Sequence, residues 1–263
     1  MENFIVGNIA YWTNDSLETA FGNDSVVLSG AKCSMGGKKR TVFEFQPLDW
    51  QFERIFLNFN FDRVVFMSQY LTFQGNRQDE LESLHRVLSL CRKSHIGEVI
   101  YIVSQDVCRD EGSDAILLRA AEELCTYSRE KNWVPVTVIR CPYLIGGNVP
   151  SDYWYQVFQG LEEKGSWVFR TRPEELADFV DMADIAEFLR RLFDEGIHNN
   201  QVLELHGSRS LTFQEVAQWL KEQYPYADIR FEGWKSWDPP ELGENQARSK
   251  LGWFPKVSMA ESL

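Results

Sequence analysis

The stretch Arg119–Gly147, RAAEELCTYSREKNWVPVTVIRCPYLIGG, reads as the second half of a helix followed by a buried strand. Small and apolar residues recur at helical spacing on one side and charged residues lie largely opposite, which predicts a helix over Asp114–Asn132. Val136–Arg140, VTVIR, is apolar on both faces, as is typical of a strand enclosed between two layers of helices. The stretch therefore indicates an α/β fold.

The same alternation extends from this stretch back to the N-terminus. Further apolar runs predict strands at Asn3–Gly7, Ser25–Leu28, Thr41–Phe45, Arg63–Met67 and Glu98–Val103. Amphipathic stretches between them predict helices at Asp49–Leu57 and Asp79–Ser94. Strands alternating with helices through right-handed crossovers predict a doubly wound, Rossmann-like parallel sheet.

The composition changes after residue 147. Residues 151–169 are aromatic-rich, 177–193 read as a helix, 201–205 as a strand, and a further helix begins near Thr212 with a capping Glu215. We expect a dinucleotide-binding type of domain over 1–148, completed by about 176–206, and a smaller α+β substrate lobe over 149–175 and 207–263. The tryptophans of the last segment, Trp234, Trp237 and Trp253, predict that it packs onto this lobe.

Composition restricts the partners and the compartment. The 263 residues are 44% hydrophobic, which is enough to form a core, and 27 basic against 39 acidic residues give a net charge of −12. This charge disfavours nucleic acid and anionic membranes as partners. The start, MENFIVGNIAYW, lacks the pattern of a signal peptide, and five scattered cysteines without a CxxC pair indicate reduced thiols. We therefore expect a cytoplasmic protein.

Three stretches carry a more specific pattern. They are Arg119–Gly147, Ala177–Leu189 (ADFVDMADIAEFL) and Ala247–Leu263 (ARSKLGWFPKVSMAESL). In order and spacing they resemble the RPxxxYG, DFVHVDDIA and LGWxPK elements of the extended short-chain dehydrogenase/reductase family, the NAD-dependent epimerases and dehydratases acting mostly on nucleotide sugars. The resemblance covers nearly the whole chain. It implies NAD or NADP as cofactor, a nucleotide or nucleotide sugar as ligand, and a homodimer.

The first turn departs from the family pattern. GNIAYWT stands where the family has GxxGxxG, so Gly7 is kept while Ala10 and Thr13 replace the other glycines, which let backbone approach the cofactor pyrophosphate. A plain turn that holds no dinucleotide is the alternative, and the sequence leaves it open. The resemblance implies cofactor contacts from Gly7, Ala10, Tyr11, Thr13, Lys38, Lys39, Arg40, Ser68 and Pro142.

A basic cluster follows the second predicted strand. Lys32 and Lys38–Arg40 are of the type that would attract the 2′-phosphate of NADP, and an exposed basic surface loop is the alternative. Pro47 stands where the family has an acidic residue near the adenine.

The catalytic positions also differ. The family uses a tyrosine acid/base, a lysine four residues later and a serine, and these positions match Asp114, Leu118 and Gln105. The YxxxK pair Tyr127 and Lys131 lies too late on its helix and is interpreted as a surface pair. The weak catalytic candidates are Ser104, Gln105, Asp114 and Tyr143, with Asp106 and Tyr153 as further possibilities.

No other chemistry stands out. The four histidines lack metal-ligand spacing, Asp181 and Asp184 are interpreted as helix-start residues, and Cys141 as a small buried hydrophobe. Two hypotheses remain: a divergent epimerase/dehydratase-like protein that binds a dinucleotide or nucleotide sugar, and a non-catalytic sensor or partner-binding subunit that has lost the cofactor.

Overall fold

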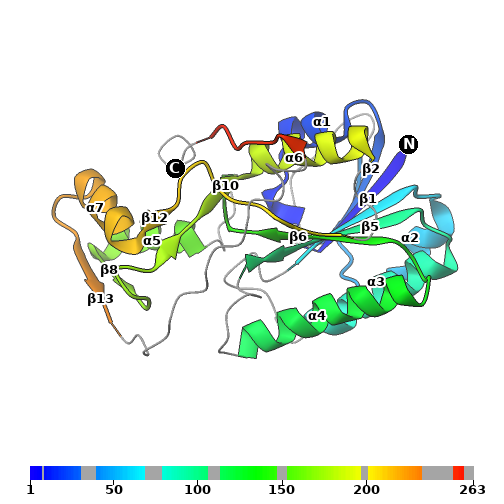
Figure 1. Ribbon diagram of the computed structural model, residues 1–263, viewed down its shortest axis with the longest axis horizontal. Helices are drawn as coiled ribbons and strands as arrows, with labels where there is room; N and C mark the ends of the chain where they lie inside the picture. Colours follow the sequence, from blue (N-terminus) through cyan, green and yellow to red (C-terminus); the bar gives the residue numbers. More distant parts are fainter. Residues whose placement is uncertain are drawn as a thin grey trace.

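The computed structural model describes residues 1–7, 9–30, 40–68, 79–105, 113–146, 153–196, 201–232 and 251–257. A twisted parallel sheet lies between two layers of helices, and a smaller group of strands and helices is attached at one end (Figure 1). The doubly wound α/β fold predicted from the sequence is confirmed. None of the described helices is long and apolar enough to cross a membrane.

The large sheet has seven strands in the order β11-β6-β5-β4-β1-β2-β3, and every neighbouring pair is parallel. The strands are β1 (Glu2–Gly7), β2 (Ser25–Gly30), β3 (Arg40–Phe43), β4 (Arg63–Met67), β5 (Glu98–Ser104), β6 (Val136–Cys141) and β11 (Val202–Glu204). All seven lie within a residue or two of the predicted runs, because central strands are apolar on both faces.

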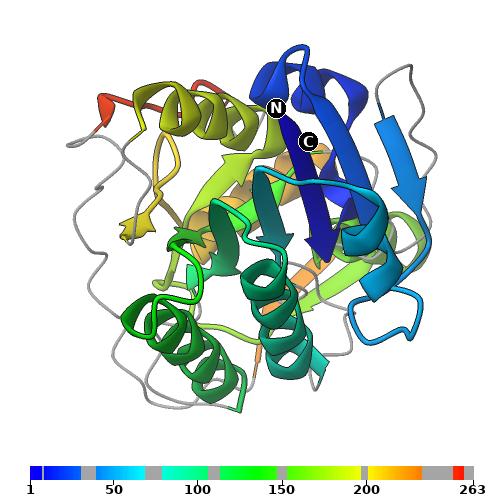
Figure 2. The same cartoon turned by 90° about the vertical axis from the view of Figure 1, so that its right-hand side faces the viewer.

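Helices lie on both faces of this sheet (Figure 2), and a hydrophobic core lies between the helices and the sheet on each face. Successive residues of β1 point to opposite faces, so Ile5 enters one core while Phe4 and Val6 enter the other. The first core is covered by α1 (Asn14–Phe21) and α6 (Met182–Glu195). The second is covered by α2 (Glu53–Asn58), α3 (Glu80–Lys93) and α4 (Ser113–Glu130).

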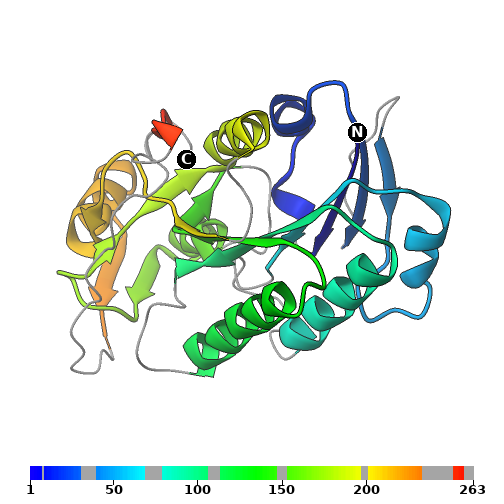
Figure 3. The same ribbon diagram turned by 45° about the vertical axis from the view of Figure 1, so that its right-hand side comes forward.

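The smaller part lies beside the large sheet (Figure 3) and has a third core, which is rich in aromatic side chains. Trp154, Phe169 and Phe213 are buried at its centre. Its elements are β7 (Tyr143–Ile145) paired with β10 (Phe179–Asp181), β8 (Ser166–Phe169) with β13 (Asp228–Phe231), β9 (Leu176–Ala177) with β12 (Leu211–Thr212), and the helices α5 (Tyr153–Lys164) and α7 (Phe213–Gln223). The capping box predicted for α7 is present, since Thr212 and Glu215 bond each other's backbone N–H groups.

The helix predicted over 177–193 begins five residues later than expected. Residues 177 and 179–181 belong to strands, and α6 starts at Met182. The physical reason lies in Asp181, whose side chain accepts a hydrogen bond from the Ala183 N–H at 2.7 Å and so caps the helix at this point.

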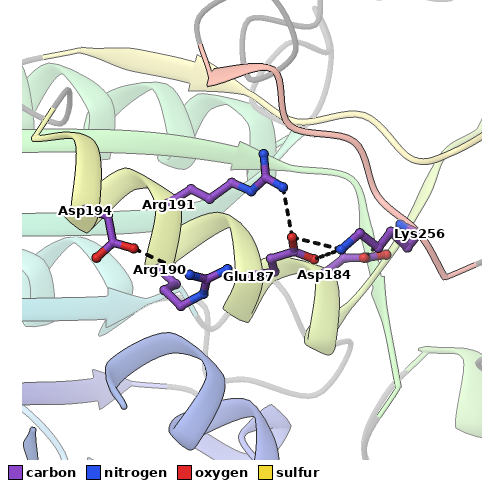
Figure 4. Close-up of polar contacts among 6 residues, drawn as sticks. All are labelled: Asp184, Glu187, Arg190, Arg191, Asp194 and Lys256. Atoms are coloured by element: carbon purple, nitrogen blue, oxygen red, sulfur yellow. Dashed lines mark hydrogen bonds and ion pairs between the residues drawn. The ribbon is translucent and has the colours of Figure 1, made fainter. Parts of the chain in front are cut away.

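The segment 251–257 docks on α6 (Figure 4). Both carboxylate oxygens of Asp184 accept backbone N–H groups, from Lys256 at 2.8 Å and from Val257 at 3.0 Å. Trp253 is fully buried against Phe188, with ring centroids 5.2 Å apart. The expectation that Trp253 packs onto the smaller lobe is therefore wrong, and Asp184 holds this segment in place rather than capping the helix start. Trp234 and Trp237 lie outside the described residues.

Glu187 completes this attachment. Its carboxylate accepts a hydrogen bond from the Lys256 ammonium at 2.7 Å and another from Arg191 at 3.1 Å, as Figure 4 shows. The Lys256 hydrogen bond is the main reason that the pKa of Glu187 lies below its ordinary value.

We predict that Glu187→Gln destabilises the protein by about 0.5 to 1 kcal/mol at neutral pH. Because the pKa of Glu187 is lowered on folding, its contribution is present above the unfolded pKa and is lost as the pH falls through the folded one. Urea unfolding of the variant and the wild type should therefore converge in acid. Asp194→Asn is the control, since its ion pair with Arg190 is exposed and should contribute little. A difference that persists unchanged into acid would contradict the prediction.

Candidate functional site

The candidate site lies at the carboxyl edge of the large sheet, where β1 and β4 are neighbours and the strand order reverses. Ligands of open α/β sheets bind outside the strand ends at such a point. Gly7 ends β1 with φ of +93°, and a Cβ there would lie 2.1 Å from the carbonyl oxygen of Met67. A Cβ on Gly30 would lie 2.5 Å from the carbonyl oxygen of Gly7. Both positions therefore require glycine for the packing of the backbone itself.

The turn after Gly7 is filled by its own side chains. Ile9, Tyr11 and Trp12 are buried in the core beneath the turn, and the Trp12 indole donates to the sulfur of Met67 at 2.7 Å. Residues 9–11 form a single 3₁₀ turn, within which the Trp12 N–H donates to the Ile9 carbonyl at 3.2 Å. Ala10 lies on this turn, and its side chain is outside the described residues.

Helix α1 starts only at Asn14, because Thr13 caps it. The Thr13 hydroxyl accepts the Ser16 N–H at 3.1 Å, and the Thr13 N–H donates to the Ser16 hydroxyl at 2.8 Å. Asp15 adds a carboxylate to the first helical turn, where it stabilises the helix but repels another anion. The helix ends at Phe21, before Gly22.

Arg40 lies beside this helix start. Its guanidinium donates to the side-chain oxygen of Asn14 and, at 3.0 Å, to the Asn14 carbonyl. A cation is thus held next to the turn that follows β1. Lys32, Lys38 and Lys39 lie outside the described residues.

The described residues fit a phosphate-bearing ligand at two points, the left-handed turn at Gly7 and the cation of Arg40. They offer fewer backbone donors than a glycine-rich turn does, because the N–H groups of Trp12 and Ser16 are already bonded within the protein. Pro47, at the position that the family resemblance places near the adenine, is buried. The carboxylate of Asp49 accepts the backbone N–H of Gln46 at 2.6 Å.

The positions that match the family's catalytic residues are placed as follows. Leu118 is fully buried in the core between sheet and α4, and Asp114 lies on α4 with its side chain outside the described residues. Gln105 follows β5 and donates its side-chain amide to the carbonyl of Leu205. Ser104, half-buried, pairs in register with Cys141. The described residues bring no tyrosine and lysine together at this edge.

Tyr143 belongs to the core of the smaller part. Its ring lies 6.2 Å from that of Trp154, 5.8 Å from Phe179 and 6.1 Å from Phe213, measured between centroids. Tyr153 opens α5, and its side chain, like all of Asp106, lies outside the described residues. Tyr127 and Lys131 lie together on α4 and just after it, with Tyr127 half-exposed against Trp133.

Ser68 and Pro142 are both buried at strand ends. The Ser68 hydroxyl bonds that of Tyr101, which in turn donates to the buried carboxylate of Glu80 at 2.9 Å. Burial, followed by the charge of Glu80, raises the pKa of Tyr101 well above its ordinary value. Burial likewise raises the pKa of the Cys141 thiol, with a smaller contribution from Asp178, so Cys141 stays a neutral thiol.

One pair at this edge was not identified from the sequence. Asp178 lies between β9 and β10, and its Oδ2 is 3.1 Å from Nδ1 of His206, which follows β11. Oδ1 accepts the backbone N–H of Gly207 at 2.8 Å and that of Phe179 at 3.1 Å. The two residues are 28 positions apart, and no local spacing signals their contact.

Solved structures with the same fold were found along the full chain. MoeE5 in complex with UDP-glucuronic acid and NAD has a TM-score of 0.81 and 13% identity, covering 100% of this chain and 96% of that chain. Epimerase Mth375 from Methanothermobacter thermautotrophicus has a TM-score of 0.82 and 16% identity, and the match covers 99% of this chain and 89% of that chain. DesIV, a dTDP-glucose 4,6-dehydratase from Streptomyces venezuelae with NAD bound, has a TM-score of 0.79 and 13% identity, and the match covers 100% of this chain and 94% of that chain.

No family model matches the sequence, and no curated protein does. At 13 to 16% identity, the structural similarity establishes the fold alone. The chain thus has the fold of nucleotide-sugar epimerases and dehydratases, which confirms the fold that the family resemblance implies.

We predict that Gly7→Ala destabilises the protein by about 2 to 5 kcal/mol, the sum of left-handed backbone strain and of overpacking against Met67. Gly22→Ala is the matched control: its φ is also positive, at +57°, but a Cβ would meet nothing within 4 Å. The control should cost only about 1 to 2 kcal/mol in denaturant unfolding. Equal losses in the two variants would show that the contact with Met67 is unimportant.

Proposed function

We propose that the protein binds a dinucleotide, NAD or NADP, or a nucleotide sugar at the carboxyl edge of the large sheet, and that it does not use the family's tyrosine, lysine and serine for chemistry. The observation that carries the proposal is the guanidinium of Arg40, which Asn14 holds at the start of α1, next to the turn that follows β1. We also propose a sheet domain, 1–148 with about 176–206, and a substrate lobe, 149–175 with 207–263. Within these bounds, β7 and β10 pack in the core of the lobe, and residues 251–257 return to pack on α6 of the sheet domain.

Charge and position support this proposal. Arg40 is fixed to the first residue of α1, so its cation and the positive end of the helix lie on the same side of the turn. The similar structures of MoeE5 and DesIV hold NAD, and that of MoeE5 also holds UDP-glucuronic acid. A bound nicotinamide dinucleotide would supply hydride transfer. Its pyrophosphate would lie at the turn after Gly7, and Arg40 would contact the 2′-phosphate of NADP.

A second candidate is a non-catalytic sensor or partner-binding subunit without cofactor. One specific observation favours it: the N–H groups of Trp12 and Ser16 are bonded within the protein, and Asp15 adds negative charge beside them. A phosphate would therefore meet fewer free donors and an unfavourable carboxylate.

Binding separates the two candidates. We predict that NADP, NAD or UDP-glucose at millimolar concentration raises the melting temperature by a few degrees, because a ligand that binds only the folded state stabilises it. Differential scanning fluorimetry measures the shift, with inorganic pyrophosphate as a control for simple anion binding. An unchanged melting temperature with all three nucleotides would favour the partner-binding candidate.

The second test concerns Arg40. We predict that Arg40→Gln weakens the binding of NADP by about 5-fold and that of NAD less, because only NADP carries the additional 2′-phosphate. Arg209→Gln is the matched control, since Arg209 is an exposed arginine paired with Glu215 on the smaller part of the molecule. Isothermal titration calorimetry gives both affinities. Equal weakening in the two variants would point to a general charge effect instead.

A further inference from the structure

A second group of polar side chains gathers at the same edge of the sheet, beyond the turn at Gly7. Gln105 follows β5, Cys141 ends β6, and His206 follows β11 by two residues. The amide of Gln105 donates to the carbonyl of Leu205, immediately before His206. The Leu205 N–H donates to the Arg140 carbonyl at 3.0 Å, which fixes this segment against β6. His206 is therefore anchored at the ligand-binding edge.

The imidazole of His206 is oriented by Asp178. This carboxylate is buried, and its Oδ1 is occupied by the backbone N–H groups of Phe179 and Gly207, which leaves Oδ2 for Nδ1 of His206 at 3.1 Å. Because an ionised carboxylate only accepts hydrogen bonds, the single hydrogen of the neutral imidazole lies on Nδ1, and Nε2 of that form carries the lone pair. The tautomer of His206 is thus set by the protein.

The backbone around the pair is built for this contact. A Cβ on Gly207 would lie 2.1 Å from the carbonyl oxygen of Phe179 and 2.6 Å from Oδ1 of Asp178. Only glycine allows residue 207 to approach Asp178 so closely. The pair is therefore a constrained arrangement and not a chance contact between surface side chains.

The other nitrogen of the ring has no partner. Among the described residues, Nε2 of His206 is buried and makes no hydrogen bond. An acceptor that is buried and unpaired costs free energy, which a ligand with a hydroxyl donor would recover.

We propose that Nε2 of His206, held by Asp178, accepts a hydrogen bond from a sugar hydroxyl of the bound nucleotide and takes its proton. In that step the O–H bond breaks, the Nε2–H bond forms, and the electron pair stays on the ligand oxygen. The imidazolium that results is balanced by the carboxylate of Asp178. His206 would supply acid/base chemistry at an edge that lacks the family's tyrosine, and Asp178 is a positioning residue. This inference rests on the proposed function.

Nitrogen NMR of the histidine rings tests the arrangement without requiring turnover. The chain has four histidines, and His206→Gln identifies the signal of His206. In the wild type at neutral pH, we expect hydrogen on Nδ1 and none on Nε2. In Asp178→Asn, the two backbone N–H groups should hold the amide oxygen at Oδ1, which turns the amide NH₂ toward Nδ1 and moves the ring hydrogen to Nε2. A wild-type ring with hydrogen on Nε2 would overturn the proposal.

Ligand addition tests the role of Nε2. We expect whichever of NADP, NAD or UDP-glucose raises the melting temperature to shift the Nε2 signal of His206. His85, which lies on α3 and packs near Trp133, serves as the internal reference. Inorganic pyrophosphate carries no sugar hydroxyl and should leave the signal in place. A ligand that raises the melting temperature while the His206 signal stays unchanged would overturn this inference alone. If no nucleotide raises the melting temperature, the proposed function fails, and the role of His206 fails with it.

Discussion

The close approach between Gly7 and the carbonyl of Met67 determines how the two central strands, β1 and β4, end side by side. A side chain at residue 7 would collide with that carbonyl at 2.1 Å, so β1 and β4 can end side by side only with glycine there. The indole of Trp12 bonds the sulfur of the same methionine, and the backbone of Gly30 packs on the carbonyl of Gly7. This contact sets how closely the ends of β1 and β4 approach each other, and Thr13 then caps α1 at Asn14. The glycine is thus explained by the packing of the protein, whether or not a ligand binds.

The residues that form the fold are different from the residues that could carry out a reaction. The sheet order, the two covered faces and the smaller part are those of nucleotide-sugar epimerases and dehydratases. At the edge of this chain's sheet, Thr13 and Ser16 bond each other, Leu118 enters the core, and Gln105 bonds the backbone of Leu205. Hydrophobic packing tolerates many sequences that keep volume and pattern, whereas catalysis needs particular atoms in particular places. The packing that forms the fold can therefore be kept while the polar residues at the sheet edge vary.

The strands of the large sheet could be predicted because Val, Ile and Phe fill both faces of each central strand, and the cap of α7 could be predicted because Thr212 and Glu215 are three residues apart. The start of α6 was missed, since residues 177–193 continue a helical pattern and only the cap at Asp181 breaks it. The binding of segment 251–257 by Asp184 and the pair of Asp178 and His206 join distant parts of the chain. Such contacts depend on the tertiary fold, and no local pattern records them.

The position of residues 251–257 on α6 has a consequence for synthesis. The backbone N–H of Lys256, which bonds Asp184, lies 72 residues later in the chain, and Trp253, which packs on Phe188, is also synthesised later. During translation the large sheet can assemble before residues 251–257 are available. Until then, the carboxylate of Asp184 and the ring of Phe188 lack the contacts that this segment provides. Folding of the sheet domain on the ribosome can therefore be completed only after residue 257 has left the exit tunnel, and until then α6 is the surface that a chaperone would encounter.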